Sequence, residues 1–288
     1  MGKYSEALKK SQTPKVDKPH SAPEAEPEQS TPTTREAVDA LRMDRSPPQG
    51  PHVPEVTPAA SRMDPRLQIF TEPNAIAGEA FKMLRAKILT RKADSRPRSI
   101  MITSPQPMDG KTMVSANLAI SIARGINEYV VLVDCDLRRP SMHKLLGINA
   151  QTGIREYLEQ GTSVADYMVK TPIDKLTLLP AGKPAPNPSE LLSSEKMHQL
   201  VEELKARYQD RYVIFDATPA QFSAETSFLA SMVDAVIVVV RAGKTAKPLL
   251  LDAVEIIGRD KILGLVFNAS TETLKEYGYY YEYYSKPR

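Results

Sequence analysis

The residues most able to do chemistry begin with a short loop between an apolar run and a stretch of helical period. Residues 104–112 read Ser-Pro-Gln-Pro-Met-Asp-Gly-Lys-Thr, so that Gly110, Lys111 and Thr112 stand at the predicted helix start. In a Walker A loop, backbone N–H groups and the helix start cradle phosphates, the lysine reaches the β and γ phosphates, and the hydroxyl ligates Mg²⁺. The stretch therefore predicts a site for ATP and Mg²⁺.

This loop departs from the strict pattern at two positions. Pro105 stands where a strict motif has glycine, and Met108 stands where many such loops have another glycine. A left-handed backbone at Met108 would cost about 1–2 kcal/mol, or roughly a tenfold loss of nucleotide affinity. The residues expected to surround the phosphates are Met108, Asp109, Gly110, Lys111, Thr112 and Met113.

Carboxylates end two further apolar runs. Residues 130–133 deliver Asp134 and Asp136 two positions apart, and residues 212–215 deliver Asp216, which looks like a Walker B aspartate. For either run alone, an ordinary cap or turn residue is the alternative. Three such sites in sequence favour a nucleotide-handling centre over that alternative.

These residues suggest a division of tasks in phosphoryl transfer. Lys111 would neutralise charge on the transferring phosphate, and Thr112, Asp136 and Asp216 would hold Mg²⁺ and its waters. Asp134 is the candidate base for an incoming hydroxyl, although the carboxylate roles could be exchanged. Arg138 would hold phosphate or substrate, with a surface salt bridge as an equally good alternative.

The elements that must position these residues alternate along the chain. Apolar, β-branched runs predict strands at 99–103, 130–134, 176–179, 212–216, 235–241 and 262–268. Helical periodicity predicts helices at 76–90, 111–124, 189–208, 222–232 and 247–259. This order predicts an α/β fold with a largely parallel twisted sheet and helices on both faces, whose ligands bind at the carboxyl ends of the strands.

Composition divides the 288 residues into three parts. Residues 1–65 are rich in Pro, Glu, Thr, Ser and Lys, which predicts a disordered arm before a folded domain at 66–276. A net charge of +3 with 25% charged residues argues against a nucleic-acid binder. No apolar run approaches the roughly 20 residues that span a bilayer, so we expect a soluble, intracellular protein.

The last part, residues 277–288, is a tail that contains half of the twelve tyrosines. A sticky or loosely docked end is the plain reading of such a segment. Beside a phosphate-binding loop, the tail instead predicts that the chain phosphorylates itself. The predicted acceptors are Tyr277, Tyr279, Tyr280, Tyr281, Tyr283 and Tyr284.

Together these features resemble the bacterial protein-tyrosine kinases of the exopolysaccharide and capsule type, within the deviant Walker A P-loop ATPases. The likeness runs from Asn74 to the end and includes residues 180–192, similar to a loop and helix start common in these kinases. Glu79, Lys82 and Arg85 are similar to the family's Glu-x-x-Arg-x-x-Arg oligomerisation motif, with lysine replacing the first arginine.

The resemblance implies a P-loop NTPase fold and ATP-dependent tyrosine autophosphorylation that regulates polysaccharide polymerisation and export. It also implies that subunits form a ring and that Asn268 touches adenine, with an ordinary strand cap as the alternative for Asn268. The tail lies too close in sequence to the last predicted strand to reach its own active site easily, so we expect each tail to be phosphorylated by a neighbour in the ring. A membrane-embedded polysaccharide chain-length protein would activate the kinase and hold it peripherally at the inner face of the cell membrane. A tyrosine phosphatase would oppose the reaction.

Two other functions are compatible with parts of the sequence. A related ATPase that positions cargo or division machinery would carry a lysine near the start of the phosphate loop, where this chain has Gln106. A catalytically weak or silent scaffold would keep the fold and tail while Pro105 and Met108 impair ATP use. ATP binding separates the scaffold from the kinase.

Overall fold

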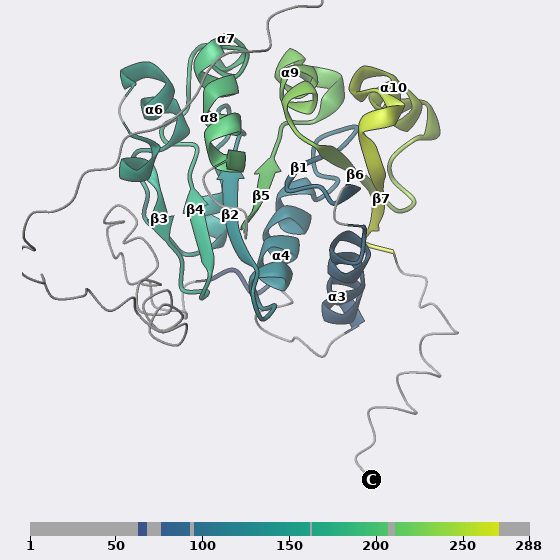
Figure 1. Cartoon of the computed structure of the whole chain (residues 1–288). Coiled ribbons are helices and arrows are strands. Elements are labelled where there is room, and N and C mark those ends of the chain that lie inside the picture. The colour runs from purple at the N-terminus through teal and green to yellow at the C-terminus, as the bar shows by residue number, and fades with distance from the viewer. Residues whose placement is uncertain (1–62, 68–75, 93–94, 162, 207–210, 271–288) are drawn as a thin grey trace, which may run out of the picture. The chain divides into compact units, whose positions relative to one another are not determined.

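The structure is a computed structural model that describes residues 63–67, 76–92, 95–161, 163–206 and 211–270. They lie in the second of two units of the chain, Gly50–Arg288. The centre is a seven-stranded sheet with the order β3-β4-β2-β5-β1-β6-β7 (Figure 1). The strands are β1 Ser99–Thr103, β2 Tyr129–Asp134, β3 Val169–Lys170, β4 Leu176–Leu179, β5 Arg211–Asp216, β6 Ala235–Arg241 and β7 Ile262–Asn268.

The predicted strands and the largely parallel sheet are confirmed. Every neighbouring pair is parallel except β3 and β4, which form an antiparallel edge. The sequence did not predict β3, because its two residues are too few to show a periodicity.

Helices cover both faces of the sheet, as the apolar strands require. Side chains alternate along a strand, so Val131 and Phe215 enter a core beneath α8, α9 and α10, whereas Leu132 and Ile214 enter a core beneath α3 and α4. The α-helices are α3 Ile76–Leu89, α4 Lys111–Ala123, α5 Met142–Leu145, α6 Ile154–Gln160, α7 Pro188–Leu192, α8 Glu195–Ala206, α9 Ala224–Met232 and α10 Lys247–Ile257. Three 3₁₀ turns are η3 Val164–Tyr167, η4 Ala220–Phe222 and η5 Arg259–Lys261.

The single helix predicted at 189–208 is wrong, because the structure has two helices there, α7 and α8. Ser194 lies between them, and its hydroxyl oxygen accepts a hydrogen bond from the Met197 backbone N–H at 3.2 Å. Serine side chains compete with the helical backbone for hydrogen bonds and favour helix starts. The chain therefore turns at this point and restarts as α8.

The strand order brings the predicted acidic residues to one edge. β2, β5 and β1 are consecutive in the sheet, and Asp134 lies directly beside Asp216 in the β2–β5 register. Ile102, one residue before the end of β1, pairs with Asp216 on the other side. The phosphate loop and both strand-terminal acids thus share the carboxyl edge of the sheet.

The described part of the chain begins within the last residues of the predicted arm. Met63 and Leu67 are buried in the core beneath α4, and the Asp64 backbone N–H donates to the Leu145 carbonyl at 3.0 Å. This short segment therefore packs onto the sheet domain. Residues 1–62 and the predicted tail at 277–288 lie outside the described residues.

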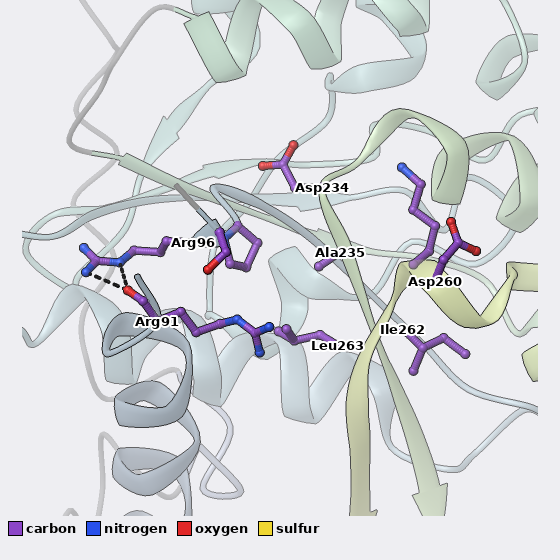
Figure 2. A pocket seen from close by; sticks show the side chains of 10 residues that line it. Arg91, Arg96, Asp234, Ala235, Asp260, Ile262 and Leu263 are labelled. Atoms are coloured by element: carbon purple, nitrogen blue, oxygen red, sulfur yellow. Dashed lines mark hydrogen bonds between the residues drawn. The ribbon is translucent and has the colours of Figure 1, made fainter. Parts of the chain in front are cut away.

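The opposite, amino edge of the sheet contains a pocket of about 590 Å³ (Figure 2). Arg96 donates to the Arg91 carbonyl there, and Asp234 accepts hydrogen bonds from the backbone N–H groups of Arg98 and Ser99. The lining residues are Arg91, Ser95, Arg96, Pro97, Asp234, Ala235, Asp260, Lys261, Ile262 and Leu263.

Candidate active site

The phosphate loop connects β1 to α4 and ends in a glycine at a position where any other residue would be strained. Gly110 precedes α4 with a φ of 98°, and a Cβ added to it would lie 2.0 Å from the Asn268 side-chain nitrogen. Asn268 ends β7 and donates from that nitrogen to the Asp109 carbonyl at 2.8 Å. The loop is therefore held by β7, the last described strand of the sheet.

Met108 has the left-handed backbone considered from the sequence, with a φ of 67°. Its side chain is 83% exposed, and its carbonyl accepts from Arg241 at 3.3 Å. The Asp109 carboxylate is buried and accepts from Thr245 at 2.9 Å and from Gln106 at 3.2 Å. The bonds from Arg241 and Thr245 hold the strained loop from the side of β6.

Lys111, the first residue of α4, connects the predicted acids. Its ammonium nitrogen lies 3.2 Å from Asp136 Oδ2, 3.9 Å from Asp216 Oδ2 and 3.2 Å from the Thr112 hydroxyl. Burial alone would lower the pKa of Lys111, but the charges of Asp216 and Asp136 outweigh it and raise that pKa. Lys111 is therefore held as a cation beside two carboxylates.

Asp216 is buried and only partly satisfied. Its Oδ1 accepts from the Ser115 hydroxyl at 3.0 Å, whereas its Oδ2 has no hydrogen-bond partner among the described residues. Burial raises the pKa of Asp216, and Lys111 opposes that effect. A buried acidic oxygen without a donor is suited to an incoming cation or its water.

This arrangement fits Mg²⁺ better than a metal held by protein alone. Within the described ranges, no three His, Cys, Asp or Glu residues form a group that could hold a metal ion. Mg²⁺ usually takes one or two carboxylates, keeps several waters and shares phosphate oxygens with the nucleotide. Thr112, Asp136 and the Asp216 oxygen that lacks a hydrogen-bond donor among the described residues supply that kind of donor set.

Asp134 has a different environment from the other two acids. Its Oδ1 accepts from the Asp136 N–H at 3.1 Å, and its Oδ2 accepts from the N–H groups of Ser141 and Met142 at 3.2 and 3.1 Å. Burial and the charge of Asp216 raise the pKa of Asp134 to about 7, although these donors oppose the shift. Asp134 thus shapes the loop that carries Asp136.

Arg138 forms an ion pair with a residue that the sequence did not single out. Its guanidinium donates to the buried Glu225 carboxylate at 2.8 Å. Glu225 and Ser115 were both missed. Glu225 lies in the first turn of a helix, where an acid usually serves only to stabilise the helix dipole. Ser115 lies four residues after Lys111, and only the predicted burial of α4 could have drawn attention to it.

The other predicted residues lie in separate places. Met113 packs against the core beneath α4. Lys82 forms an ion pair with Glu79 at 2.6 Å, and Arg85 donates to the Ser121 carbonyl on α4 at 2.7 Å. The motif residues on α3 therefore make contacts within the chain, and the six predicted acceptor tyrosines fall outside the described residues.

Comparison with known proteins agrees with this geometry. Residues 98–259 match the AAA domain family. The tyrosine-protein kinase YwqD of Bacillus subtilis (strain 168) is 33% identical over 223 residues, which cover 76% of this chain and 93% of the relative. The chain belongs to the bacterial protein-tyrosine kinases.

Solved structures extend the likeness to three dimensions. The chimerical protein CapA2B2 is 28% identical with a TM-score of 0.66, covering 73% of this kinase and 92% of that chain. The kinase domain of the Escherichia coli tyrosine kinase ETK is 25% identical with a TM-score of 0.65, covering 77% and 88%. The kinase therefore has the P-loop fold of this family and transfers phosphate to protein tyrosine. None of its described helices is long and apolar enough to cross a membrane.

Proposed function

We propose that this kinase uses ATP and Mg²⁺ to phosphorylate the tyrosine cluster at its own C-terminus. The observation that carries the proposal is the convergence of Lys111, Asp136 and Asp216 at one sheet edge, in a chain whose last twelve residues include six tyrosines. The acceptors are Tyr277, Tyr279, Tyr280, Tyr281, Tyr283 and Tyr284.

The proposed reaction breaks the bond between the γ-phosphorus and the β–γ bridging oxygen and forms a bond from that phosphorus to the tyrosine oxygen. Bound Mg²⁺ would neutralise charge on the phosphate oxygens, with Thr112, Asp136 and Asp216 as its protein donors. Lys111 stabilises the charge that develops on the leaving ADP, and the loop N–H groups hold the phosphates in line.

The phenolic proton goes to an acid at the end of β2 or just after it. Asp134 is the assigned acceptor. Its Oδ2 accepts from the N–H groups of Ser141 and Met142, so these bonds must open before that oxygen can accept a proton from a substrate. Such a rearrangement on substrate binding is common, because catalytic hydrogen bonds often form only in the complex with substrate. Asp136 is the alternative acceptor because it is partly exposed and closer to Lys111. Asp134→Asn and Asp136→Asn, compared at saturating ATP, show which acid has the larger effect on kcat.

The test uses purified protein with ATP and Mg²⁺, with and without the cytoplasmic segment of a candidate membrane partner. Mass spectrometry and an anti-phosphotyrosine blot report the product, beside Lys111→Ala and a chain that ends at Glu276. Phosphate on the tail that disappears in both controls supports the proposal. Absence of product in every mixture, together with absent ATP binding, contradicts it and favours the silent scaffold.

A mixing experiment tests transfer between subunits. Full-length Lys111→Ala offers a tail but no active site, whereas the chain ending at Glu276 offers an active site but no tail. Phosphate on the Lys111→Ala tail in the mixture supports transfer between neighbours. Product from wild-type protein with none in the mixture would contradict it.

We further propose a regulatory setting in exopolysaccharide or capsule production. A separate membrane-embedded chain-length protein activates the kinase at the inner face of the membrane, and a phosphatase reverses the reaction. Glu79, Lys82 and Arg85 on α3 contribute to a ring, which tail phosphates loosen because each adds about −1.5 to −2 charges. Identical sedimentation of phosphorylated and unphosphorylated protein with the partner would contradict this switch.

One observation favours the scaffold as second candidate. Met108 has left-handed backbone and Pro105 lies at the loop start, so that strain opposes nucleotide binding. Calorimetric titration with ATP separates the two functions, because a silent scaffold shows no binding under conditions where the kinase saturates.

A further inference from the structure

A buried glutamate is connected by hydrogen bonds to segments that carry the candidate site, and it has no task among those assigned so far. Glu225, in the first turn of α9, is 1% exposed. Its Oε1 accepts from Arg138 and from the Ser189 hydroxyl, both at 2.8 Å, and its Oε2 accepts from the Ser223 hydroxyl. All of these donors come from different segments at the carboxyl edge of the sheet.

The network reaches the root of the phosphate loop. The Thr218 hydroxyl lies 2.6 Å from that of Ser223, and the Thr218 carbonyl accepts from the Thr103 hydroxyl at 2.7 Å. Thr103 is the last residue of β1, directly before the phosphate loop. Glu225 therefore connects three segments to the base of the phosphate loop. They are the loop after β2, the start of α7 and the segment after Asp216.

Arg138 is the one charged side chain among the described residues of this network that is exposed to solvent. Its side chain is 52% exposed, and only its Nη2 nitrogen contacts Glu225 and, at 3.5 Å, Ser189. No other described residue bonds its remaining guanidinium N–H groups. Arg138 follows Asp136 by two residues, and Asp136 lies 3.2 Å from Lys111.

We propose that Glu225 is a positioning residue that holds Arg138 ready to bind phosphate oxygens during transfer, an inference that rests on the proposed function. An arginine on an exposed loop loses side-chain entropy when it binds an anion. The buried carboxylate removes part of that freedom beforehand and leaves the outward N–H donors available, which is the preorganisation that favours the transition state over the bound ground state.

A purely structural role predicts different behaviour. Glu225 would then stabilise the packing of α9 and α7, and its removal would lower the melting temperature without acting through Arg138. Glu225→Gln is suited to separate the two, because it keeps the shape and one accepting oxygen while it removes the ion pair. Arg138→Gln in both backgrounds completes a double-mutant cycle.

The experiment measures kcat for tail phosphorylation, KM for ATP and the melting temperature of the full chain. We expect Glu225→Gln to lower kcat about tenfold or more and to change the KM for ATP less than threefold. In the Arg138→Gln background, Glu225→Gln should cause no further loss. The matched control is Glu156→Gln on α6, which also removes a buried carboxylate but keeps wild-type kcat.

Two results would overturn the inference: equal losses of kcat from Glu225→Gln in both backgrounds, or an unchanged kcat with a lowered melting temperature. A second readout does not need turnover. The dissociation constant of ADP with aluminium fluoride, a mimic of the transferring phosphoryl group, should rise in Glu225→Gln while that of ADP alone stays constant. An inactive wild type contradicts the proposed function. In that case the ratio of the two dissociation constants, for ADP with aluminium fluoride and for ADP alone, still tests the role of Glu225.

Discussion

The two edges of the sheet shift the pKa values of their aspartates in opposite directions. At the amino edge, Asp234 is partly buried, yet the N–H groups of Ser99 and Arg98 and the Lys205 ammonium hold its pKa below the ordinary value. At the carboxyl edge, burial raises the pKa of both Asp134 and Asp216. The amino edge provides donors for the Asp234 carboxylate, whereas the carboxyl edge holds two buried carboxylates, Asp134 and Asp216, side by side.

This difference distinguishes a structural carboxylate from one kept for chemistry. Asp234 begins the turn into β6 and has donors for both of its oxygens. Asp216 keeps one buried oxygen without a hydrogen-bond donor among the described residues. A charge that the fold alone does not satisfy costs stability, and such costs concentrate at functional sites.

The largest effect should come from Asp216→Asn. Asparagine keeps an oxygen for the Ser115 hydroxyl but removes the charge that would attract Mg²⁺, so we expect kcat to fall about 10³-fold. Because the pKa of Asp216 is raised, the charge opposes folding at neutral pH, and the melting temperature should stay equal or rise. A kinase assay and thermal unfolding check both values, and a large fall in melting temperature would break the comparison.

Gly110→Ala should have the next largest effect. The added Cβ meets the Asn268 side chain, and the φ of 98° strains any residue with a Cβ by about 1–2 kcal/mol. We expect at least tenfold weaker ATP binding in a calorimetric titration. Gly243→Ala is a control with positive φ but no neighbour within 4 Å of its Cβ, and an equal loss of ATP affinity there would contradict the role of the Asn268 contact.

Asp234→Asn should affect stability without affecting catalysis. Loss of charge-assisted bonds to two N–H groups should lower the free energy of unfolding by about 1–2 kcal/mol at pH 7. A carboxyl whose pKa is lowered by folding stabilises the native state above the unfolded pKa, near 3.9, and loses this effect as pH falls through the folded pKa. The difference from wild type, measured by urea unfolding, should therefore shrink below about pH 4.

A change in kcat for Asp234→Asn would weaken the contrast between the two edges. The same conclusion would follow if the stability difference persisted unchanged at pH 3.

The smallest effect should come from Met108→Gly. Glycine adopts the left-handed backbone without a steric cost, so the variant should gain up to about 1 kcal/mol in the loop and several-fold in ATP affinity. Thermal unfolding with and without ATP measures both. Unchanged ATP affinity with raised stability would show that the strain is the same with and without nucleotide and lowers only the stability of the fold.

Much of this arrangement could be predicted from the sequence because it depends on local patterns. Continuous apolar runs predicted β1, β2 and β5, and the rule that parallel strands share a carboxyl edge predicted that Asp134 and Asp216 meet. The glycine usual at position 108 raised the possibility of a left-handed backbone there, and the structure has it.

What could not be predicted depends on contacts between distant segments. Glu225 meets Arg138 from 87 positions away, and Asn268 meets Asp109 from 159 positions away. Their residue types fit an ordinary helix start and an ordinary strand end. The break at Ser194 was missed because the apolar period continues across it, and only the local hydrogen bonds of the serine decide against a continuous helix.

The bond from Asn268 to the Asp109 carbonyl makes the end of β7 and the nucleotide loop thermodynamically linked. A ligand that reshapes residues 109 and 110 must shift or break this bond. By linkage, the factor by which the ligand changes the equilibrium for displacing Asn268 is the factor by which that displacement changes the affinity for the ligand. Asn268, at the end of the edge strand β7, thus also reports the state of the nucleotide loop, and it precedes the tail tyrosines in the sequence.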